Sequence, residues 1–493
     1  MVALKTVIGQ EIPARPVTSK DDELAVWSWN AWRPTSVEDD YEITDIDGEI
    51  PADLNGTLYR NGPSQQIQPG GDYTRLHFFD GDGLVHAFRI EDGRAWYRDR
   101  FVRNQSFVAE QQARVTNQHH IGPRADVGVA PVMPRRTSNT NAVYHAGRLL
   151  AMVENGLPFE IDARTLDPIG DYDFGGSLLA PWVSAHPKTD GRTGQMLIHG
   201  YFIREPYLQV YIVEPDGSVS FRQPVAIPYP AFLHDLAITD NHFIVPIHPI
   251  VLEVPWKDGL PVGNYGEWMM WRPERGLRFA VVSRQGGQAR LFDAPTPYAI
   301  FHVGNAYEAD GRIHLDAYMY NDGLQKMKAM ERMRQGVWLE GAGAYRVEYE
   351  LDLTSGLCTE RQVSDRPGEW PRLNEAFTGC RNRWGYSIEA ERDYLILANS
   401  SLRVLKYDRH GGPSSRHDFG YGYFPGEPVF VPRAGATEED DGYLLTVVYD
   451  AHQDRSLLGI LDAQRIDDPP LAKLHLRHRV PAGFHGNWAN GVV

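Results

Sequence analysis

The chain has 493 residues, of which 42% are hydrophobic and 23% charged, values typical of a soluble globular protein and not of a disordered or membrane-spanning one. Its formal net charge of -16 argues against a broad electrostatic grip on nucleic acid or anionic lipid, because both need clustered Lys and Arg. We therefore expect a neutral or apolar small molecule as the partner.

The pattern along the chain predicts a long series of β-hairpins. Residues 1–45 are predicted to form an N-terminal extension with a short helix near Asp21. From about Asn55 onward, short apolar runs end in Asp-Gly, Asn-Gly or Gly-Gly turns, as at Asp92-Gly93, Asp216-Gly217 and Asp310-Gly311. No Ser-rich, Pro-rich or charged linker divides them, so we predict one all-β domain over residues 1–493. A β-propeller suits this size better than a sandwich does.

Helical signal is sparse and lies between the predicted strands. Segments at about 250–275 and 320–340 are expected to supply a small helical cap. The second segment carries a helical stripe of Leu324, Met327, Met330 and Met333. Such stripes usually fill cores, so a helix packed on the propeller is the plain interpretation. An apolar lid that admits a greasy substrate is the alternative.

The two cysteines, Cys358 and Cys380, form no CxxC pair, which indicates neither a disulfide framework nor a thiolate metal site. The N-terminus lacks the apolar central region of a secretory signal, and no window reaches the about 18 uninterrupted apolar residues of a spanning helix. We expect a cytoplasmic protein with at most peripheral membrane contact.

Several common catalytic signatures are absent, namely the GxSxG elbow, the GxxxxGK[ST] phosphate loop, the HExxH zinc helix and the GxGxxG dinucleotide turn. Among the 18 histidines, four stand apart because each lies beside apolar or aromatic residues and small turn-forming ones. They are His186, His234, His302 and His485. This setting suits inner strands that end on a propeller axis, where a ring fold brings distant residues together. A hydrogen-bonded structural imidazole is the alternative for each.

Nine stretches from about Pro51 to Trp488 resemble, in order, the signatures of the carotenoid cleavage oxygenase family. They are PADLNGTLYRNGP, HFFDGDGLVHAF, SNTNAV, SAHPKTD, FLHDLAIT, FHVGNAYE, GEWPRLN, PGEPVFVPR followed by EDDGYLL, and FHGNWAN. Each is weak alone, but nine in the family's order are specific. The resemblance implies a seven-bladed β-propeller with a helical cap over its metal face. It also implies that four histidines bind Fe(II), and the matching positions are His186, His234, His302 and His485.

The resemblance further implies three glutamates around these ligands, at Glu154, Glu369 and Glu427. Neutral imidazole suits Fe(II), and four such ligands leave the double positive charge of the ion uncompensated, which nearby carboxylates offset. A glutamate that accepts a hydrogen bond from Nδ1–H also fixes the tautomer in which Nε2 faces the metal. A surface salt bridge is the alternative role for each glutamate.

Residues around the motifs are expected to shape the oxygen site and the substrate tunnel. Thr140 matches the position whose methyl group in relatives crowds one iron coordination site and leaves a single place for O2 or water. Four aromatic residues are predicted to wall an apolar tunnel for a flat conjugated ligand. They are Phe79, Phe301, Trp370 and Phe484. A strand hydroxyl and plain core packing are the respective alternatives.

The implied activity is that of a non-haem Fe(II) dioxygenase that adds O2 across a conjugated C=C bond and releases two carbonyl products without an organic cofactor. Relatives that cleave hydroxylated stilbenes or isoeugenol carry a Lys before the Glu154 position and an upstream Tyr. This chain has Val153 and NQHHIGPRADVG there. An apocarotenoid is therefore the first expectation, and a phenylpropanoid or stilbene alkene, held by His119 or His120, is the alternative. A polyene isomerase or a propeller that only binds its ligand forms a second class.

Overall fold

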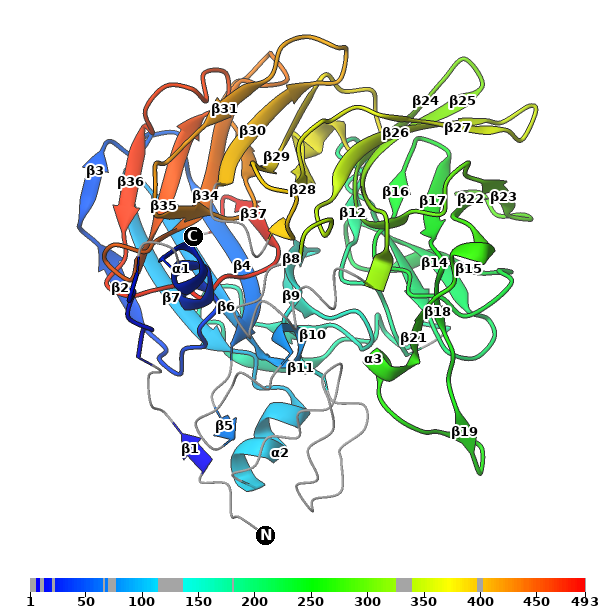
Figure 1. Ribbon diagram of the computed structural model, residues 1–493, viewed down its shortest axis with the longest axis horizontal. Coiled ribbons are helices and arrows are strands. Elements are labelled where there is room, and N and C mark those ends of the chain that lie inside the picture. The colour runs from blue at the N-terminus through cyan, green and yellow to red at the C-terminus, as the bar shows by residue number, and fades with distance from the viewer. Residues whose placement is uncertain are drawn as a thin grey trace.

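Seven antiparallel sheets form a ring around a central axis in the computed structural model (Figure 1). The structure describes residues 6–8, 13–19, 23–64, 67–69, 77–113, 136–179, 181–324, 339–396 and 402–492. Each sheet is one blade of four to six strands. The prediction of an all-β seven-bladed propeller is confirmed.

The first three blades contain the N-terminal strands and the last strand of the chain. From its outer edge to the axis, blade 1 comprises β2 (Asp40–Ile43), β7 (Arg94–Phe101), β6 (Asp82–Glu91), β4 (Gly56–Ser64) and β37 (Gly486–Asn490). Blade 2 comprises β11 (Pro168–Asp171), β10 (Phe159–Ile161), β9 (Arg148–Met152) and β8 (Asn141–His145). Blade 3, from the axis outward, comprises β12 (Lys188–Thr189), β13 (Met196–Tyr201), β14 (Leu208–Val213) and β15 (Val219–Val225).

The next three blades run from the axis outward in chain order. Blade 4 comprises β16 (Ala237–Ile238), β17 (His242–Ile247), β22 (Arg278–Ser283) and β23 (Arg290–Asp293). Blade 5 comprises β24 (Ala299–Ala309), β25 (Arg312–Tyr320), β26 (Tyr345–Asp352) and β27 (Cys358–Gln362). Blade 6 comprises β28 (Gly368–Arg372), β29 (Trp384–Ala390), β30 (Leu402–Asp408) and β31 (Ser415–His417).

Blade 7 joins the two ends of the chain. It comprises β32 (Tyr423–Pro425) and β33 (Val429–Pro432), which both pair with β34 (Gly442–Asp450), then β35 (Arg455–Asp462), β36 (Ala472–His475) and β3 (Ile46–Gly48). In blade 1, β37 pairs with β4, which sets Gly486 opposite Arg60. The pairing of β3 with β36 and the pairing of β4 with β37 each join an N-terminal to a C-terminal strand. Together they close the ring and cover the strand edges at the junction.

The hydrophobic core lies between neighbouring blades. Leu58 and Phe88 of blade 1 pack in one cluster with Leu445 and Leu458 of blade 7. The outer strand β7 alternates buried with partly exposed side chains, whereas β4 is buried along its whole length. Inner strands are thus covered on both faces, which fixes the axial position of any side chain they carry.

The predicted hairpin turns take the backbone conformations that their residues favour. Asp92 and Gly93 have φ of 51° and 72° between β6 and β7, and Asp310 and Gly311 have the same values between β24 and β25. Two successive residues with positive φ define the type I′ turn, whose twist matches that of the paired strands. These turns confirm the predicted hairpins.

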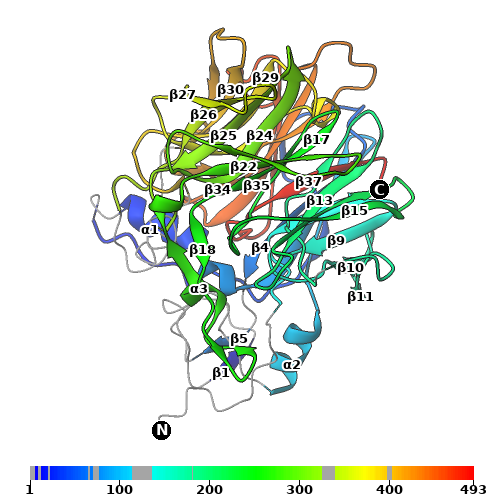
Figure 2. The ribbon, with the colours of Figure 1, turned by 90° about the vertical axis from the view of Figure 1, so that its right-hand side faces the viewer.

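Short elements outside the blades lie on one side of the ring, below the sheets in both ribbon views (Figures 1 and 2). They include α2 (Gln105–Ala113), the pair β1 (Thr6–Ile8) and β5 (Ile67–Pro69), and α3 (Tyr265–Trp268). The other helices within the described residues are α1 (Glu23–Ala31) and the 3-10 turns η2 (Phe78–Asp80), η3 (Pro273–Arg275) and η4 (Glu375–Phe377). The position of α1 confirms the predicted N-terminal helix.

The cap segment at 250–275 consists mainly of strands. The hairpin β18 (Ile250–Leu252) with β21 (Met269–Trp271) encloses the smaller hairpin β19 (Trp256–Lys257) with β20 (Leu260–Pro261) and the single turn α3. Asn264 caps α3 by accepting a hydrogen bond from the Glu267 backbone. The predicted stripe at Met327, Met330 and Met333 lies outside the described residues. None of the described helices is long and apolar enough to cross a bilayer.

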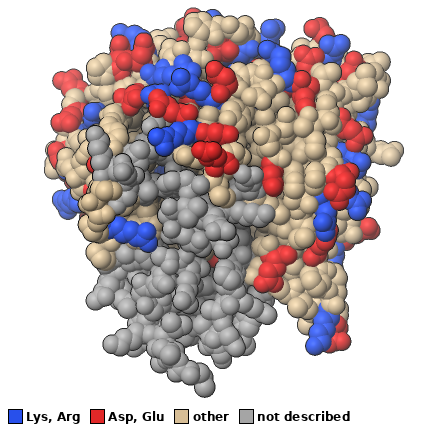
Figure 3. Space-filling view, viewed as in Figure 1, with Lys and Arg blue, Asp and Glu red and all other residues tan. Residues whose placement is uncertain are grey.

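Charged side chains of both signs are interspersed on the face seen in Figure 3. Among the described residues, oppositely charged side chains pair across neighbouring strands, as Arg94 does with Glu42 at 2.9 Å and Arg312 with Glu350 at 3.3 Å.

The strand that closes blade 7 provides a test of the ring closure. We predict that Gly48→Ala lowers the thermal unfolding midpoint more than Gly93→Ala does. Both glycines have left-handed φ, a conformation that disfavours any Cβ by about 1–2 kcal/mol. At Gly48 the added Cβ would also overlap the Leu471 carbonyl of the paired strand, whereas at Gly93 it meets open space. Equal shifts of the midpoint would contradict this assignment.

Candidate metal centre

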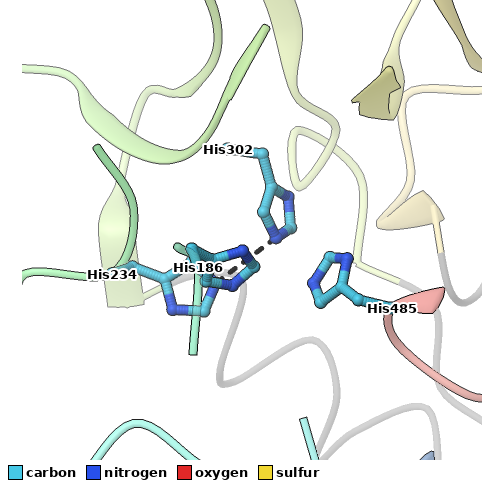
Figure 4. A group of neighbouring side chains, drawn as sticks. All are labelled: His186, His234, His302 and His485. Atoms are coloured by element: carbon cyan, nitrogen blue, oxygen red, sulfur yellow. Dashed lines mark hydrogen bonds between the residues drawn. The ribbon is translucent and has the colours of Figure 1, made fainter. Parts of the chain in front are cut away.

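Four histidines from four different blades meet at the axis. His186 and His234 lie just before the inner strands β12 and β16, His302 lies within β24, and His485 directly precedes β37. One nitrogen of each imidazole lies within 4.8 Å of the corresponding nitrogen of every other (Figure 4). The structure therefore brings together all four histidines that the sequence singles out, and no two of them share a blade.

The four rings are packed closely and away from solvent. Ring centroids are 4.3 Å apart for His186 and His234 and 4.9 Å apart for His302 and His485. None of the four residues is more than 8% exposed. Burial and the neighbouring imidazoles lower the pKa of His186 well below its usual value, so this ring is neutral. Neutral rings present lone pairs that can bind a cation.

Two features of the centre fit a metal ion. The Nε2 atom of His186 is buried and finds no hydrogen-bond donor or acceptor in the part of the chain that the structure describes. The Nε2 atoms of His234 and His302 face each other at 3.3 Å. A shared cation would give all these converging nitrogens a partner, and imidazole is a ligand for several first-row transition metals.

Three glutamates surround the histidines, and the structure assigns each to a ring. Glu369 Oε2 lies 2.5 Å from Nδ1 of His302, and Glu427 Oε1 lies 2.9 Å from Nδ1 of His485. Glu154 Oε1 lies 3.3 Å from Nδ1 of His234 and 3.7 Å from Nε2 of His186. For His302 and His485, a proton on Nδ1 leaves the Nε2 lone pair facing the centre.

The three carboxylates sit in different electrostatic environments. Burial raises the pKa of Glu154 well above its ordinary value, and Asp235 acts in the same direction. Burial also acts to raise the pKa of Glu427, but the Arg372 guanidinium and the hydrogen bond from His485 outweigh it and hold that pKa at about 2. Arg372 Nη1 lies 3.3 Å from Glu427 Oε2. Glu427 is therefore ionised, whereas the environment of Glu154 favours its neutral form.

Glu369 and Trp370 are adjacent in sequence, yet both face the axis. A register shift between Glu369 and Arg372 in the pairing of β28 with β29 marks a bulge. Trp370 has φ of 58°, a conformation that bulky residues rarely adopt. Its backbone N–H donates to Glu369 Oε2 at 2.9 Å, and Tyr320 donates to Oε1 at 2.7 Å. The strained residue thus helps to hold the carboxylate against His302.

An apolar cavity opens on one side of the four histidines, and we term it the metal cavity. Its wall includes every aromatic residue that the sequence assigns to a tunnel, together with Thr140. These residues are Phe79, Phe301, Trp370 and Phe484. Thr140 adjoins the centre, because its carbonyl accepts the His485 N–H at 3.2 Å. Its hydroxyl donates to Asn139 at 3.2 Å.

Several wall residues were not anticipated from the sequence. Phe232 lies two residues before His234. This short distance in sequence from a predicted metal ligand is the feature that could have identified it as a wall residue. Tyr265 and Met269 come from the cap segment, which carries no local motif. Tyr265 also lies 2.9 Å from the hydroxyl of Tyr201, which donates to Glu154 at 3.4 Å.

The opposite side of the centre is polar. There a second cavity is lined by His186, His302 and His485 together with the ion pair of Lys188 and Asp235, whose atoms are 2.8 Å apart. The four histidines thus separate an apolar compartment from a polar one. An apolar ligand has one side from which it can approach the centre.

Comparison with known proteins gives consistent similarities. The profile described as retinal pigment epithelial membrane protein matches residues 32–490. The chain is 34% identical to an isoeugenol monooxygenase of Pseudomonas nitroreducens, over 92% of this chain and 96% of that protein. It is 33% identical to an apocarotenoid-15,15'-oxygenase of Synechocystis, over 91% and 93%. The crystal structure of a cobalt-substituted Synechocystis apocarotenoid oxygenase superposes with a TM-score of 0.83 at 30% identity, covering 94% and 99%.

The geometry predicts that the centre holds one metal ion per chain and that His234→Ala removes most of it. Loss of one of four ligands weakens binding because only three imidazoles remain to hold the ion. His314→Ala, on the outward-facing part of β25, serves as the matched control. Metal content after reconstitution with Co(II), together with the visible absorption of the ion, measures the outcome. Full occupancy in the His234 variant would contradict the assignment.

Proposed function

This chain belongs to the carotenoid cleavage oxygenase family, and we propose that its four axial histidines hold Fe(II) for the cleavage of a conjugated C=C bond by O2. The observation that carries the proposal is the opening of a four-imidazole centre onto an apolar, aromatic-walled cavity. Relatives in the family include an apocarotenoid-15,15'-oxygenase and a carotenoid 9,10(9',10')-cleavage dioxygenase. An alkene and one O2 together contain all the atoms of two carbonyl products, so the reaction balances without an organic cofactor.

Fe(II) is the ion that suits both the ligands and the reaction. Imidazole accommodates zinc, copper, nickel and iron, so the donor set alone leaves several metals open. A bound Fe(II) ion supplies the redox chemistry that O2 needs in order to react with an alkene. Four nitrogen ligands leave coordination positions for small molecules. In our proposal Thr140 crowds one of these positions with its methyl group, while its hydroxyl is engaged by Asn139.

The residues of the protein orient the metal ligands, hold the substrate and shield it from water. Glu369 and Glu427 fix the tautomers of His302 and His485, so that the metal-facing nitrogens carry lone pairs. The aromatic wall formed by Phe301, Trp370 and Phe484 holds a flat conjugated chain beside the centre and excludes bulk water. Their contribution is the placement of the double bond within reach of O2.

We propose an apocarotenoid as the first substrate class. Val153 lines the metal cavity at the position where phenol-cleaving relatives carry a Lys, so this contact to a phenol oxygen is replaced by an apolar one. The two nearly equal identities, 34% to an isoeugenol monooxygenase and 33% to an apocarotenoid oxygenase, do not favour either branch. Tyr265 keeps the phenylpropanoid alternative open, because its ring lines the same cavity.

Aerobic incubation of the Fe(II)-loaded protein with an apocarotenal and with 4-vinylguaiacol tests the function. We expect the apocarotenal to yield two carbonyl fragments in mass spectrometry at a higher kcat/KM than 4-vinylguaiacol. Under 18O2 each fragment should carry one labelled oxygen. A shifted isomer without fragments would indicate a polyene isomerase, and label in only one fragment would contradict dioxygenation.

The role of the outer carboxylates is tested by Glu369→Gln. We predict a loss in kcat/KM of about 10–100-fold, because an amide holds the His302 tautomer less firmly than a carboxylate does. The control is Glu308→Gln. Glu308, near the C-terminal end of β24, lies 2.8 Å from Nδ1 of His242 and makes the same type of contact with a histidine outside the four-histidine centre. Similar losses in both variants would mean that the effect is not specific to the centre.

A further inference from the structure

A second pocket lies behind the aromatic wall of the metal cavity. We term it the Arg60 pocket, and its wall includes Arg60, Trp32, Leu402, Phe424, Val447 and Trp370. Trp370 and Ile396 line both this pocket and the metal cavity. Trp32 also packs against Phe484 of the metal cavity, with ring centroids 6.0 Å apart. The two cavities are therefore adjacent and share these side chains in their linings.

The guanidinium of Arg60 is buried in this apolar wall with most of its donors unused. Arg60 is 6% exposed, and the structure records one hydrogen bond from its side chain, from Nη2 to the Gly483 carbonyl at 3.3 Å. The buried Nε finds no acceptor among the described residues. Glu427 acts on Arg60 through its charge, yet its oxygens bond to His485 and Gly486 and pair with Arg372.

Two glycines make room for this guanidinium. A Cβ at Gly426 would lie 2.6 Å from Nη2 of Arg60, and a Cβ at Gly483 would lie 3.0 Å from Nε. Neither glycine has a left-handed φ, so neither is required by a turn. Glycine at these positions provides space, and the chain thereby builds a slot in which the guanidinium is held in one place.

A cation in an apolar pocket lowers stability unless an anion accompanies it. Burial lowers the pKa of Arg60 to about 10, so the side chain still carries its charge at neutral pH. Arginine presents parallel N–H donors that match the two oxygens of a carboxylate. The pocket thus has the charge, the donor geometry and the apolar surroundings of a site for an organic acid.

We propose that the Arg60 pocket binds the carboxylate end of the conjugated alkene whose double bond occupies the metal cavity. Arg60 stands opposite Gly486, the residue that follows His485, so the two sites are close along the paired strands β4 and β37. A conjugated acid would place its carboxylate at Arg60 and its alkene in the adjoining metal cavity. The inference rests on the proposed function and narrows its substrate class to acid-bearing conjugated alkenes.

Binding of trans-stilbene-4-carboxylate and of its neutral carboxamide tests the proposal. By calorimetry with the Co(II)-loaded protein, we expect the carboxylate to bind about 10–100-fold more tightly than the carboxamide, as for charge-assisted hydrogen bonds. Arg60→Gln should abolish this preference and leave carboxamide affinity and Co(II) content unchanged. Arg60→Lys should retain part of the preference, because it keeps the charge without the parallel donors.

Three results would overturn the proposal. The first is equal affinity of the wild-type protein for the two compounds. The second is an equal loss of affinity for both compounds in the Arg60→Gln variant. The third is a carboxylate-induced change in Co(II) absorption that persists in Arg60→Gln, which would place the acid on the metal.

Val447→Phe fills the pocket and leaves the Arg60 charge in place. This variant should strongly lower the affinity for the carboxylate. Cleavage of the neutral apocarotenal tests the proposed function separately from these results.

Discussion

The convergence of four buried imidazoles at one point is the constraint on which the rest of the structure depends. Each ring directs a nitrogen toward the others, and the protein offers His186 Nε2 no hydrogen-bond partner within its described part. Such nitrogens are satisfied by a cation held in common. The strand pairing of β37 with β4 closes the ring and brings His485 to the axis beside the other three.

Charged side chains and apolar cavity walls surround the centre, and they have different roles. Three glutamates lie beside the imidazoles, and Arg372 pairs with Glu427, so the acidic groups stand one layer away from the centre. One side of the centre is walled by aromatic rings and the other by polar groups such as Lys188 and Asp235. This asymmetry gives an apolar alkene a defined direction of approach.

Trp370 connects the functional parts of the molecule. It lines the metal cavity, the polar cavity and the Arg60 pocket. Its left-handed backbone lets Glu369 reach His302, while its side chain lines the neighbouring cavities. A non-glycine residue in this conformation is strained, and it persists where the surrounding structure fixes it. Backbone strain, ligand orientation and cavity shape therefore meet in one residue.

The sequence by itself determined the class of fold and the histidine set. Asp-Gly turns such as Asp92-Gly93 specify hairpins locally, because few residues tolerate positive φ, and the predicted hairpins are confirmed. The family motifs singled out His186 and its three companions, and the structure places all four within 4.8 Å. The roles of Thr140 and of the tunnel residues stay predictions, although all of them line the metal cavity.

Tertiary structure alone decided the pairing of each glutamate with its histidine, the wall residues Phe232 and Tyr265, and the pocket around Arg60. The physical reason is that a propeller assembles its axis from strands of every blade. Partners such as Glu427 and His485 belong to different blades, so no local spacing links them. The cap segment at 250–275 was predicted only as a source of cap elements, and its hairpins β18–β21 and β19–β20 come from the structure.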